Sequence, residues 1–267
     1  MKKKVSLSKL RIQFITIVLS ISSVLIINKP ANANDTATVR NIIMVHGAFA
    51  DGSGWEAVYN ILTRKGYRVT IVQNPLTSLE DDVAATNFAI EKMDGPVILV
   101  GHSWGGTVIT QAGLHPKVVR LVYVAAWQPD IGESTLDLAQ SEPAAAENGV
   151  MLPDENGLIY YSREKFHKGF AGDLSKEKAD FMYDSQGAIS AKAFNARVTQ
   201  AAWRTKPSYG IIATEDKSLN PVIERKTYKR AGTIVTEIKA SHVVFISQPQ
   251  KVAAVIEAAA KGLKKSS

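Results

Sequence analysis

A single serine stands in a glycine-rich turn between two apolar runs, in the stretch VILVGHSWGGTVIT (residues 97–110). Glycines lie two residues before this serine, Ser103, and two and three residues after it. In a nucleophile elbow, a buried strand is followed by Gly-x-Ser-x-Gly and then by a helix. The sharp turn between strand and helix projects the serine hydroxyl above the sheet. Gly101 and Gly105 remove side chains that would collide in the turn, and Gly106 lets the helix pack close to the sheet. The pattern predicts a nucleophilic serine beside the free N–H groups of a helix N-terminus.

Six short apolar runs, rich in Val and Ile, recur along the chain. They cover residues 41–47, 67–75, 96–103, 118–127, 208–216 and 233–241. Runs without alternation are typical of strands that are buried on both faces. Segments with apolar residues three or four positions apart separate them, at 54–66, 78–95, 105–116, 221–232 and 249–265. Strands that alternate with helices predict an α/β fold with a mostly parallel sheet flanked by helices.

The alternation stops between about residues 128 and 201. This region holds no convincing buried strand and reads as helical and irregular segments. A long crossover between two strands is one interpretation. Because long connections in compact domains usually have a function, we favour a mainly helical cap that covers one end of the sheet.

The N-terminal residues 1–33 have the pattern of a secretory signal peptide. A basic start precedes the apolar stretch 12–27, and Ala31-Asn32-Ala33 offers a small-residue cleavage site. The apolar stretch is shorter than the roughly 20 residues that span a bilayer, so we expect cleavage after Ala33 and no stable membrane anchor. The chain has no cysteine, which excludes a disulfide framework and a lipid-modified cysteine. We expect a mature domain at 34–267 that is exported by a bacterium, to the periplasm or the medium.

The formal charge of +7 also belongs to this leader. Without its six basic residues the chain holds 26 basic and 25 acidic residues. A nearly neutral mature domain gives no reason to expect a nucleic-acid partner.

A serine hydroxyl needs a base to take its proton, and the chain offers five histidines. His102 adjoins the serine and should point away from it, and His46 ends the first strand and should shape the loop there. His115 precedes a proline at a helix end, and His167 lies in the cap region. His242 follows the last predicted strand, at the edge where the carboxyl ends of parallel strands converge. By elimination His242 is the predicted base.

The third member should be an acid that orients this histidine. Glu215 and Asp216 both follow the strand at 208–216, and the residues alone leave the choice between them open; Asp130 is a weaker rival. The chain order of serine, acid and histidine suits either neighbour. For the oxyanion we expect two backbone donors, the N–H of Trp104 and that of Ala48 in the small-residue loop HGAFADGSGW.

The stretches VHGAFADGSGW, VGHSWGG, ATEDKSLNP and ASHVVFISQP together resemble the α/β-hydrolase superfamily. They are most similar to its small esterase branch, which includes plant methyl-salicylate esterases, bacterial pyrethroid-type carboxylesterases and hydroxynitrile lyases. The resemblance extends over essentially the whole mature chain. In that branch the acid is the aspartate of the Thr-Glu-Asp segment, which implies Asp216 here. It also implies Ala48 and Trp104 as oxyanion donors, and no metal or cofactor.

Departures from the branch narrow the expected activity. Hydroxynitrile lyases carry a threonine and a lysine where this chain has Gly47 and Val243, and dehalogenases and epoxide hydrolases have an aspartate in place of Ser103. We therefore expect a serine carboxylesterase (EC 3.1.1 class) that cleaves small, largely apolar esters through an acyl-enzyme. Trp104 should narrow the acyl side of the pocket. About half of the pocket candidates should be ordinary core residues. The candidates are all aromatic or apolar: Phe49, Trp127, Phe166, Phe170, Met182 and Phe245.

Three alternatives share these motifs. The same triad supports hydrolysis of lactones or amides, or cofactor-free perhydrolysis of the haloperoxidase type. A ligand-binding protein on this fold is a second class, and a surface adhesion or scaffold protein is a third. The intact serine, acid and histidine argue against both non-enzymatic classes.

Overall fold

The computed structural model describes residues 38–263, so the expected leader at 1–33 lies outside the described residues. Within this range, no helix combines the length and apolarity that crossing a bilayer requires. The described residues belong to one compact unit, Thr36–Ser267.

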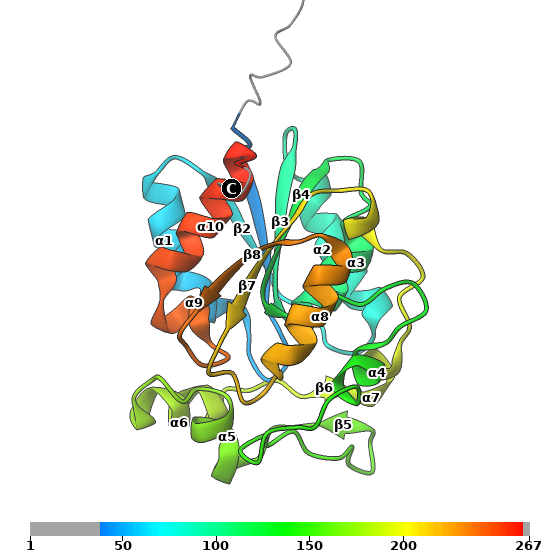
Figure 1. Cartoon of the computed structure of the whole chain (residues 1–267), viewed down its shortest axis with the longest axis vertical. Coiled ribbons are helices and arrows are strands. Elements are labelled where there is room, and N and C mark those ends of the chain that lie inside the picture. The colour runs from blue at the N-terminus through cyan, green and yellow to red at the C-terminus, as the bar shows by residue number, and fades with distance from the viewer. Residues whose placement is uncertain (1–37, 264–267) are drawn as a thin grey trace, which may run out of the picture. The chain divides into compact units, whose positions relative to one another are not determined.

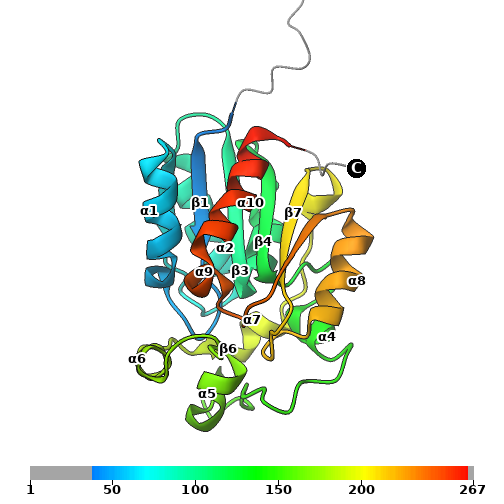
Figure 2. The same cartoon turned by 60° about the vertical axis from the view of Figure 1, so that its left-hand side comes forward.

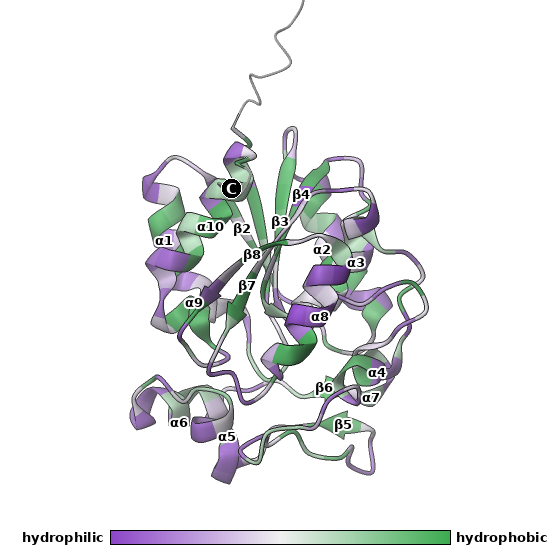
Figure 3. Ribbon diagram, viewed as in Figure 1, coloured by the Kyte–Doolittle hydropathy of each residue, from purple (hydrophilic) through white to green (hydrophobic). Residues whose placement is uncertain are grey.

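A parallel sheet of six strands forms the centre of this unit (Figure 1). Its strands are β1 (Asn41–Val45), β2 (Arg68–Val72), β3 (Val97–Ser103), β4 (Val118–Ala126), β7 (Ser208–Ala213) and β8 (Ile234–Ile238). They lie in the order β2-β1-β3-β4-β7-β8, and every neighbouring pair is parallel. The six apolar runs of the sequence are these six strands, and the α/β prediction is confirmed. Figure 3 shows apolar residues along the central strands β3 and β4, and every residue of β1 is also buried.

Helices cover both faces of the sheet (Figures 1 and 2). One face carries α1 (Glu56–Arg64) and α10 (Pro249–Lys261), which also pack against each other. The other carries α2 (Leu79–Glu91), α3 (Trp104–Ala112) and α8 (Pro221–Ala231). These are the five helices that the spacing of apolar residues predicts. The short helices η1 (Gly52–Trp55) and α9 (Val244–Ser247) follow β1 and β8.

The chain between β4 and β7 lies beyond the carboxyl ends of the strands (Figures 1 and 2). It forms α4 (Thr135–Ala139), β5 (Leu158–Ile159), α5 (Arg163–Gly169), α6 (Lys176–Asp184), β6 (Ile189–Ser190), α7 (Ala191–Asn195) and η2 (Ala202–Arg204). The strands β5 and β6 form an antiparallel pair. We call residues 128–201 the cap segment. They meet the edge where β1, β3, β7 and β8 end, so this edge of the sheet is where a site can be enclosed.

Candidate active site

Ser103 ends β3 and directly precedes α3, with a positive φ of 50°. A residue other than glycine is strained in such a conformation, by about 1–3 kcal/mol. The turn closes because its neighbours lack side chains. A Cβ on Gly101 would lie 2.4 Å from the carbonyl oxygen of Gly105, and one on Gly106 would lie 2.2 Å from that of Trp127. The close approach of strand and helix, and with it the position of Ser103, therefore requires glycine.

Three side chains from separate strand ends form one hydrogen-bonded chain. Ser103 Oγ lies 2.9 Å from His242 Nε2, and His242 Nδ1 lies 2.5 Å from Asp216 Oδ2. Asp216 follows β7 and His242 follows β8. All three are buried, with exposed fractions of 7% for Ser103, 1% for His242 and 3% for Asp216. The structure thus brings together the three residues that the sequence singles out.

The carboxylate of Asp216 fixes the direction of these bonds. Its Oδ1 accepts from the backbone N–H groups of Ser218, at 2.8 Å, and Leu219, at 2.9 Å. Its Oδ2 is left to accept from Nδ1–H of His242, which places the imidazole lone pair on Nε2. This nitrogen faces the hydroxyl of Ser103, so the arrangement can take a proton from the serine.

The two rival acids lie elsewhere. The side chain of Glu215 is 51% exposed and faces Lys239 at 3.4 Å. Asp130 accepts two hydrogen bonds from the guanidinium of Arg204, at 2.7 and 2.6 Å. Neither contacts His242, so Asp216 is the acid that the geometry pairs with this histidine.

The loop after β1 lies directly against the serine. A Cβ on Gly47 would be 2.7 Å from Cβ of Ser103. The backbone N–H groups of Ala48, in this loop, and of Trp104, at the first position of α3, have no hydrogen-bond partner among the described residues. Two free donors on either side of a serine are suited to an oxygen that becomes negative when the serine attacks a carbonyl.

A cavity of about 370 Å³ opens at this point. Ser103, His242 and Ala48 line its floor, and Phe49 and Trp127 of the predicted pocket line its walls. Most of the remaining wall is apolar and comes from the cap segment between Leu136 and Pro153, with Phe194 of α7. The cavity is therefore an enclosed, mainly apolar site built around the serine.

A model of the Alpha/beta hydrolase family matches residues 42–255 of this chain. The chain belongs to the alpha/beta hydrolase family. The match spans the serine, the acid and the histidine.

The relatives of this α/β hydrolase include, by name, a hydrolase, a binding protein and a methylesterase. A pyrethroid hydrolase from Sphingobium wenxiniae is 26% identical over 245 residues, which cover 82% of the chain and 87% of the relative. Salicylic acid-binding protein 2 from Nicotiana tabacum is 27% identical over 247 residues, which cover 80% of the chain and 95% of the relative. Putative methylesterase 11 from Arabidopsis thaliana is 29% identical over 255 residues, covering 81% of the chain and 63% of the relative. These relatives agree with the expectation of an enzyme of the carboxylesterase class.

Solved structures share the fold. A pyrethroid hydrolase from Sphingobium faniae has a TM-score of 0.71 at 23% identity, covering 85% of this chain and 99% of that one. Polyneuridine aldehyde esterase has a TM-score of 0.71 at 19% identity, covering 81% and 97%. The α/β-hydrolase fold that the sequence resembles is confirmed.

Four of the six pocket candidates do not line the cavity, against the expectation that about half of them are ordinary core residues. The rings of Phe166 and Phe170 pack on each other, 4.9 Å apart, and on Tyr161, instead of facing the cavity. Met182 and Phe245 line a different cavity of about 190 Å³, next to η1 and α6. Phe166, Phe170 and Met182 lie in the cap segment, and Phe245 lies in α9 and packs on Trp55. Their apolar composition alone did not indicate which side chains face the site.

Trp104 also departs from the expectation that its ring narrows the pocket. The indole is buried, and its Nε1–H donates to Asp82 Oδ2 of α2 at 2.7 Å. Its ring stacks on Phe194 at 5.7 Å, and it is the ring of Phe194 that lines the cavity.

Two residues that the sequence analysis did not assign hold the loop of His242. His102 points away from the cavity, as expected, and its Nε2–H donates to the backbone oxygen of His242 at 3.0 Å. Burial lowers the pKa of His102 well below its usual value, so this ring is neutral. Asp173 of the cap accepts from the N–H of Ser241 at 3.0 Å and from the hydroxyls of Ser241 and Ser247. No sequence signal links these positions, because all of the contacts are long-range.

The other histidines are structural. His46 donates from Nδ1 to the oxygen of Gly47 at 2.8 Å and accepts from the N–H of Asn74 at 2.9 Å, which fixes the loop beside the serine. Burial lowers the pKa of His46. His167 contacts the oxygen of Leu174, and His115 accepts from the N–H of Lys117.

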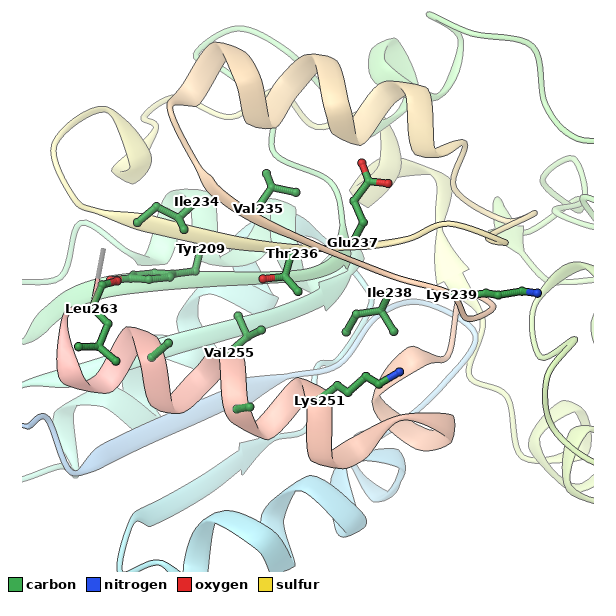
Figure 4. A pocket seen from close by; sticks show the side chains of 12 residues that line it. Tyr209, Ile234, Val235, Thr236, Glu237, Ile238, Lys239, Lys251, Val255 and Leu263 are labelled. Carbon is green, nitrogen blue, oxygen red and sulfur yellow. The ribbon is translucent and has the colours of Figure 1, made fainter. Parts of the chain in front are cut away.

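A larger groove lies away from this site. It has a volume of about 580 Å³ and runs between the edge strand β8 and α10, with Ile234, Ile238 and Val255 among its lining residues (Figure 4). None of the three hydrogen-bonded residues lines it. Among residues 38–263, no group of three His, Asp or Glu side chains is placed to hold a metal ion.

Proposed function

We propose that this α/β hydrolase cleaves carboxylic esters of small, largely apolar substrates through an acyl-enzyme on Ser103. The observation that carries the proposal is the hydrogen-bonded chain from Ser103 through His242 to Asp216, at the floor of an apolar cavity. A serine that faces a base, oriented in turn by a buried carboxylate, is the arrangement that activates a hydroxyl for acyl transfer.

The proposed reaction has two halves. Ser103 Oγ attacks the ester carbonyl carbon while His242 Nε2 takes its proton, and the carbonyl oxygen becomes negative beside the N–H groups of Ala48 and Trp104. The carbon–oxygen bond to the alcohol then breaks, and His242 gives the proton to the departing alkoxide. Water repeats the sequence on the acyl-enzyme, with His242 again as base, and releases the carboxylic acid. Asp216 stabilises the imidazolium in both halves.

The cavity supports neutral substrates with apolar groups. Glu142 is the one carboxylate among the described residues that line it, and this carboxylate pairs with Lys226. Its volume of about 370 Å³ lies near the lower end of small-molecule sites. The names of the relatives, pyrethroid hydrolase and methylesterase, support an ester as the substrate.

Hydrolysis of p-nitrophenyl esters from acetate to long-chain acids tests the proposal. We expect turnover of the short esters, and a loss of at least about 1000-fold in kcat in Ser103→Ala. Ser185→Ala, which removes an exposed cap hydroxyl, is the matched control and should match the parent. Full activity in Ser103→Ala would refute the serine mechanism. No turnover of any ester by the parent would favour lactones, peroxide chemistry or ligand binding instead.

A further inference from the structure

A second buried carboxylate stands behind the serine, and the proposed reaction does not use it. Asp82 lies in the first turn of α2 and is completely buried. Its Oδ2 accepts from Nε1–H of Trp104 at 2.7 Å, and its Oδ1 accepts from the backbone N–H of Leu76 at 2.8 Å. Both oxygens thus have a donor, and one of these donors belongs to the residue next to Ser103.

Trp104 needs an anchor outside its own helix. The first N–H groups of a helix have no intrahelical partner, so the peptide that carries this N–H is held by a backbone hydrogen bond only at its other end, where the oxygen of Ser103 accepts from the N–H of Trp127 at 3.2 Å. This N–H is also one of the two donors proposed for the oxyanion. The indole is fixed instead on two sides, by the carboxylate of Asp82 and by the ring of Phe194, stacked with an interplanar angle of 14°.

The same carboxylate ties the turn to the cap segment. Leu76 has a positive φ of 60°, which is unfavourable for a leucine, and Asp82 holds its N–H. The oxygen of Leu76 accepts from the N–H of Ser190, directly before α7. Because α7 carries Phe194, Asp82 joins the serine turn, the start of α2 and one wall of the cavity.

We propose that Asp82 is a positioning residue for the reaction: its carboxylate fixes the indole of Trp104, and through it the backbone N–H that receives the oxyanion. The inference rests on the proposed function and adds to it a residue outside the cavity. Weakening an oxyanion donor, without removing it, should lower kcat by roughly tenfold, against the hundredfold or more that loss of a donor costs.

The charge state of this carboxyl gives the proposal a second readout. Burial raises the pKa of Asp82 to about 6, and the hydrogen bonds from Trp104 and Leu76 oppose the rise. Asp81, on the same helix, adds to it, and Lys192 of α7 faces Asp81. The segments of α3 and β1 that pack against α2 contain no charged residue, and β2 contributes only Arg68, at its opposite end. Above about pH 6 the carboxylate accepts both bonds, and below it one oxygen becomes a hydroxyl.

Kinetics of Asp82→Asn, Trp104→Phe and the double variant test the proposal. The amide oxygen of the asparagine accepts only one of the two hydrogen bonds, so its N–H₂ group faces either the indole N–H or the N–H of Leu76. The phenylalanine keeps the stacked ring but has no N–H to donate. At pH 8 we expect each single variant to lose about tenfold in kcat with KM within about twofold. The kcat of the double variant should be no lower than that of Asp82→Asn, because both substitutions remove the same hydrogen bond between the indole and the carboxylate. Asp81→Asn, an exposed carboxyl in the same turn, is the matched control.

The ratio of parent to Asp82→Asn activity should fall from about ten at pH 8 toward one at pH 5, because protonation of Asp82 removes from the parent the interaction that the variant already lacks. NMR gives a readout without activity. The indole N–H signal that Trp104→Phe deletes should shift near pH 6 in the parent and not in Asp82→Asn.

Unchanged kcat in the single variants, with an active parent, would overturn the inference and leave the proposed function intact. So would an effect confined to KM, or to stability. A parent that hydrolyses no ester would overturn the proposed function and the catalytic role of Asp82 with it, whatever the NMR shows. If Asp82→Asn does not fold, the kcat of Trp104→Phe decides.

Discussion

Gly106→Ala should damage both the fold and the activity, and the structure gives the size of the effect. The new Cβ would lie 2.2 Å from the oxygen of Trp127 and 2.8 Å from Cβ of Ala126, whereas ordinary contact begins at 3.4 Å. The opposing backbone resists movement, because the N–H of Trp127 donates to the oxygen of Ser103 at 3.2 Å and the hydroxyl of Tyr228 donates to the oxygen of Ala126 at 2.8 Å.

Overpacking of this kind costs about 1–3 kcal/mol, and we take the upper end because the clash is with backbone. Replacing glycine by alanine in a helix returns about 1 kcal/mol, so the free energy of unfolding should fall by about 2 kcal/mol. That corresponds to a drop of about 4–8 °C in Tm for a domain of this size. Relief of the clash moves α3 away from the sheet by an ångström or so and takes Ser103 with it, which should lower kcat by roughly a hundredfold.

Urea unfolding followed by circular dichroism, with p-nitrophenyl acetate hydrolysis on the same samples, measures both effects. Gly187→Ala is the matched control. Its Cβ would lie 3.5 Å from a methyl group of Leu76 and its φ is not positive, so stability should be unchanged or rise by up to about 1 kcal/mol. Parent-like stability and kcat in Gly106→Ala would refute the argument that this close approach holds the serine.

Three further predictions concern the carboxylates around the site. Asp216→Asn should lower kcat by about 10⁴-fold, because an amide does not hold the same tautomer of His242. The kcat of Glu215→Gln should stay within twofold of the parent, and equal losses in the two variants would contradict the assignment of Asp216. Asp173→Ala should lower kcat by about tenfold without a matching change in KM, because the backbone at Ser241 loses its hydrogen bonds to this carboxylate. Steady-state kinetics measures the effect, and an unchanged kcat in a variant that is only less stable would contradict the prediction. The raised pKa of Asp82, about 6 against 3.8, means that its contribution to stability is complete below about pH 4 and is lost as pH rises through about 6, a change of about 3 kcal/mol. Urea unfolding at pH 4 and pH 7 should show this loss in the parent and not in Asp82→Asn, and a constant difference between the two proteins would argue against it.

The fold was predictable because its signals are local. Strands buried on both faces have to be continuously apolar, and a chain that alternates such strands with amphipathic helices has few arrangements open to it. The serine turn was predictable for the same reason, since the glycines it needs are adjacent in sequence. His242 followed by elimination from its place after the last strand.

The rest of the site depends on contacts that sequence spacing does not contain. Glu215 and Asp216 are neighbours at one strand end, and only the fold determines that the second faces inward while the first reaches Lys239. The prediction of the pocket residues was wrong for a similar reason. Phe166 and Phe170 are as apolar as any pocket residue, but they pack on each other, and the cavity wall comes from residues 136–153, which have no regular period.

Asp82 shows how a long-range contact changes the meaning of a local signal. In the sequence it is one of three acids in the first turn of a predicted helix, a position that acids favour because of the helix dipole. Glu80 and Asp81 fit that account, since both are exposed. Asp82 does not, because its side chain turns inward and meets an indole from another helix.

The two neighbours of Ser103 explain how a strained serine is held in place. His102 before it and Trp104 after it both point away from the cavity, one to the backbone oxygen of His242 and the other to the carboxylate of Asp82. A residue at φ 50° persists only where its surroundings leave no easier conformation, and two buried anchors on either side provide that restraint. The anchor of His102 ends at the backbone of the proposed base, and the anchor of Trp104 holds the residue whose own N–H is a proposed oxyanion donor. Relaxation of the turn would therefore displace Ser103, the base and the donor together, which is why we expect substitutions behind the serine to lower kcat more than they raise KM.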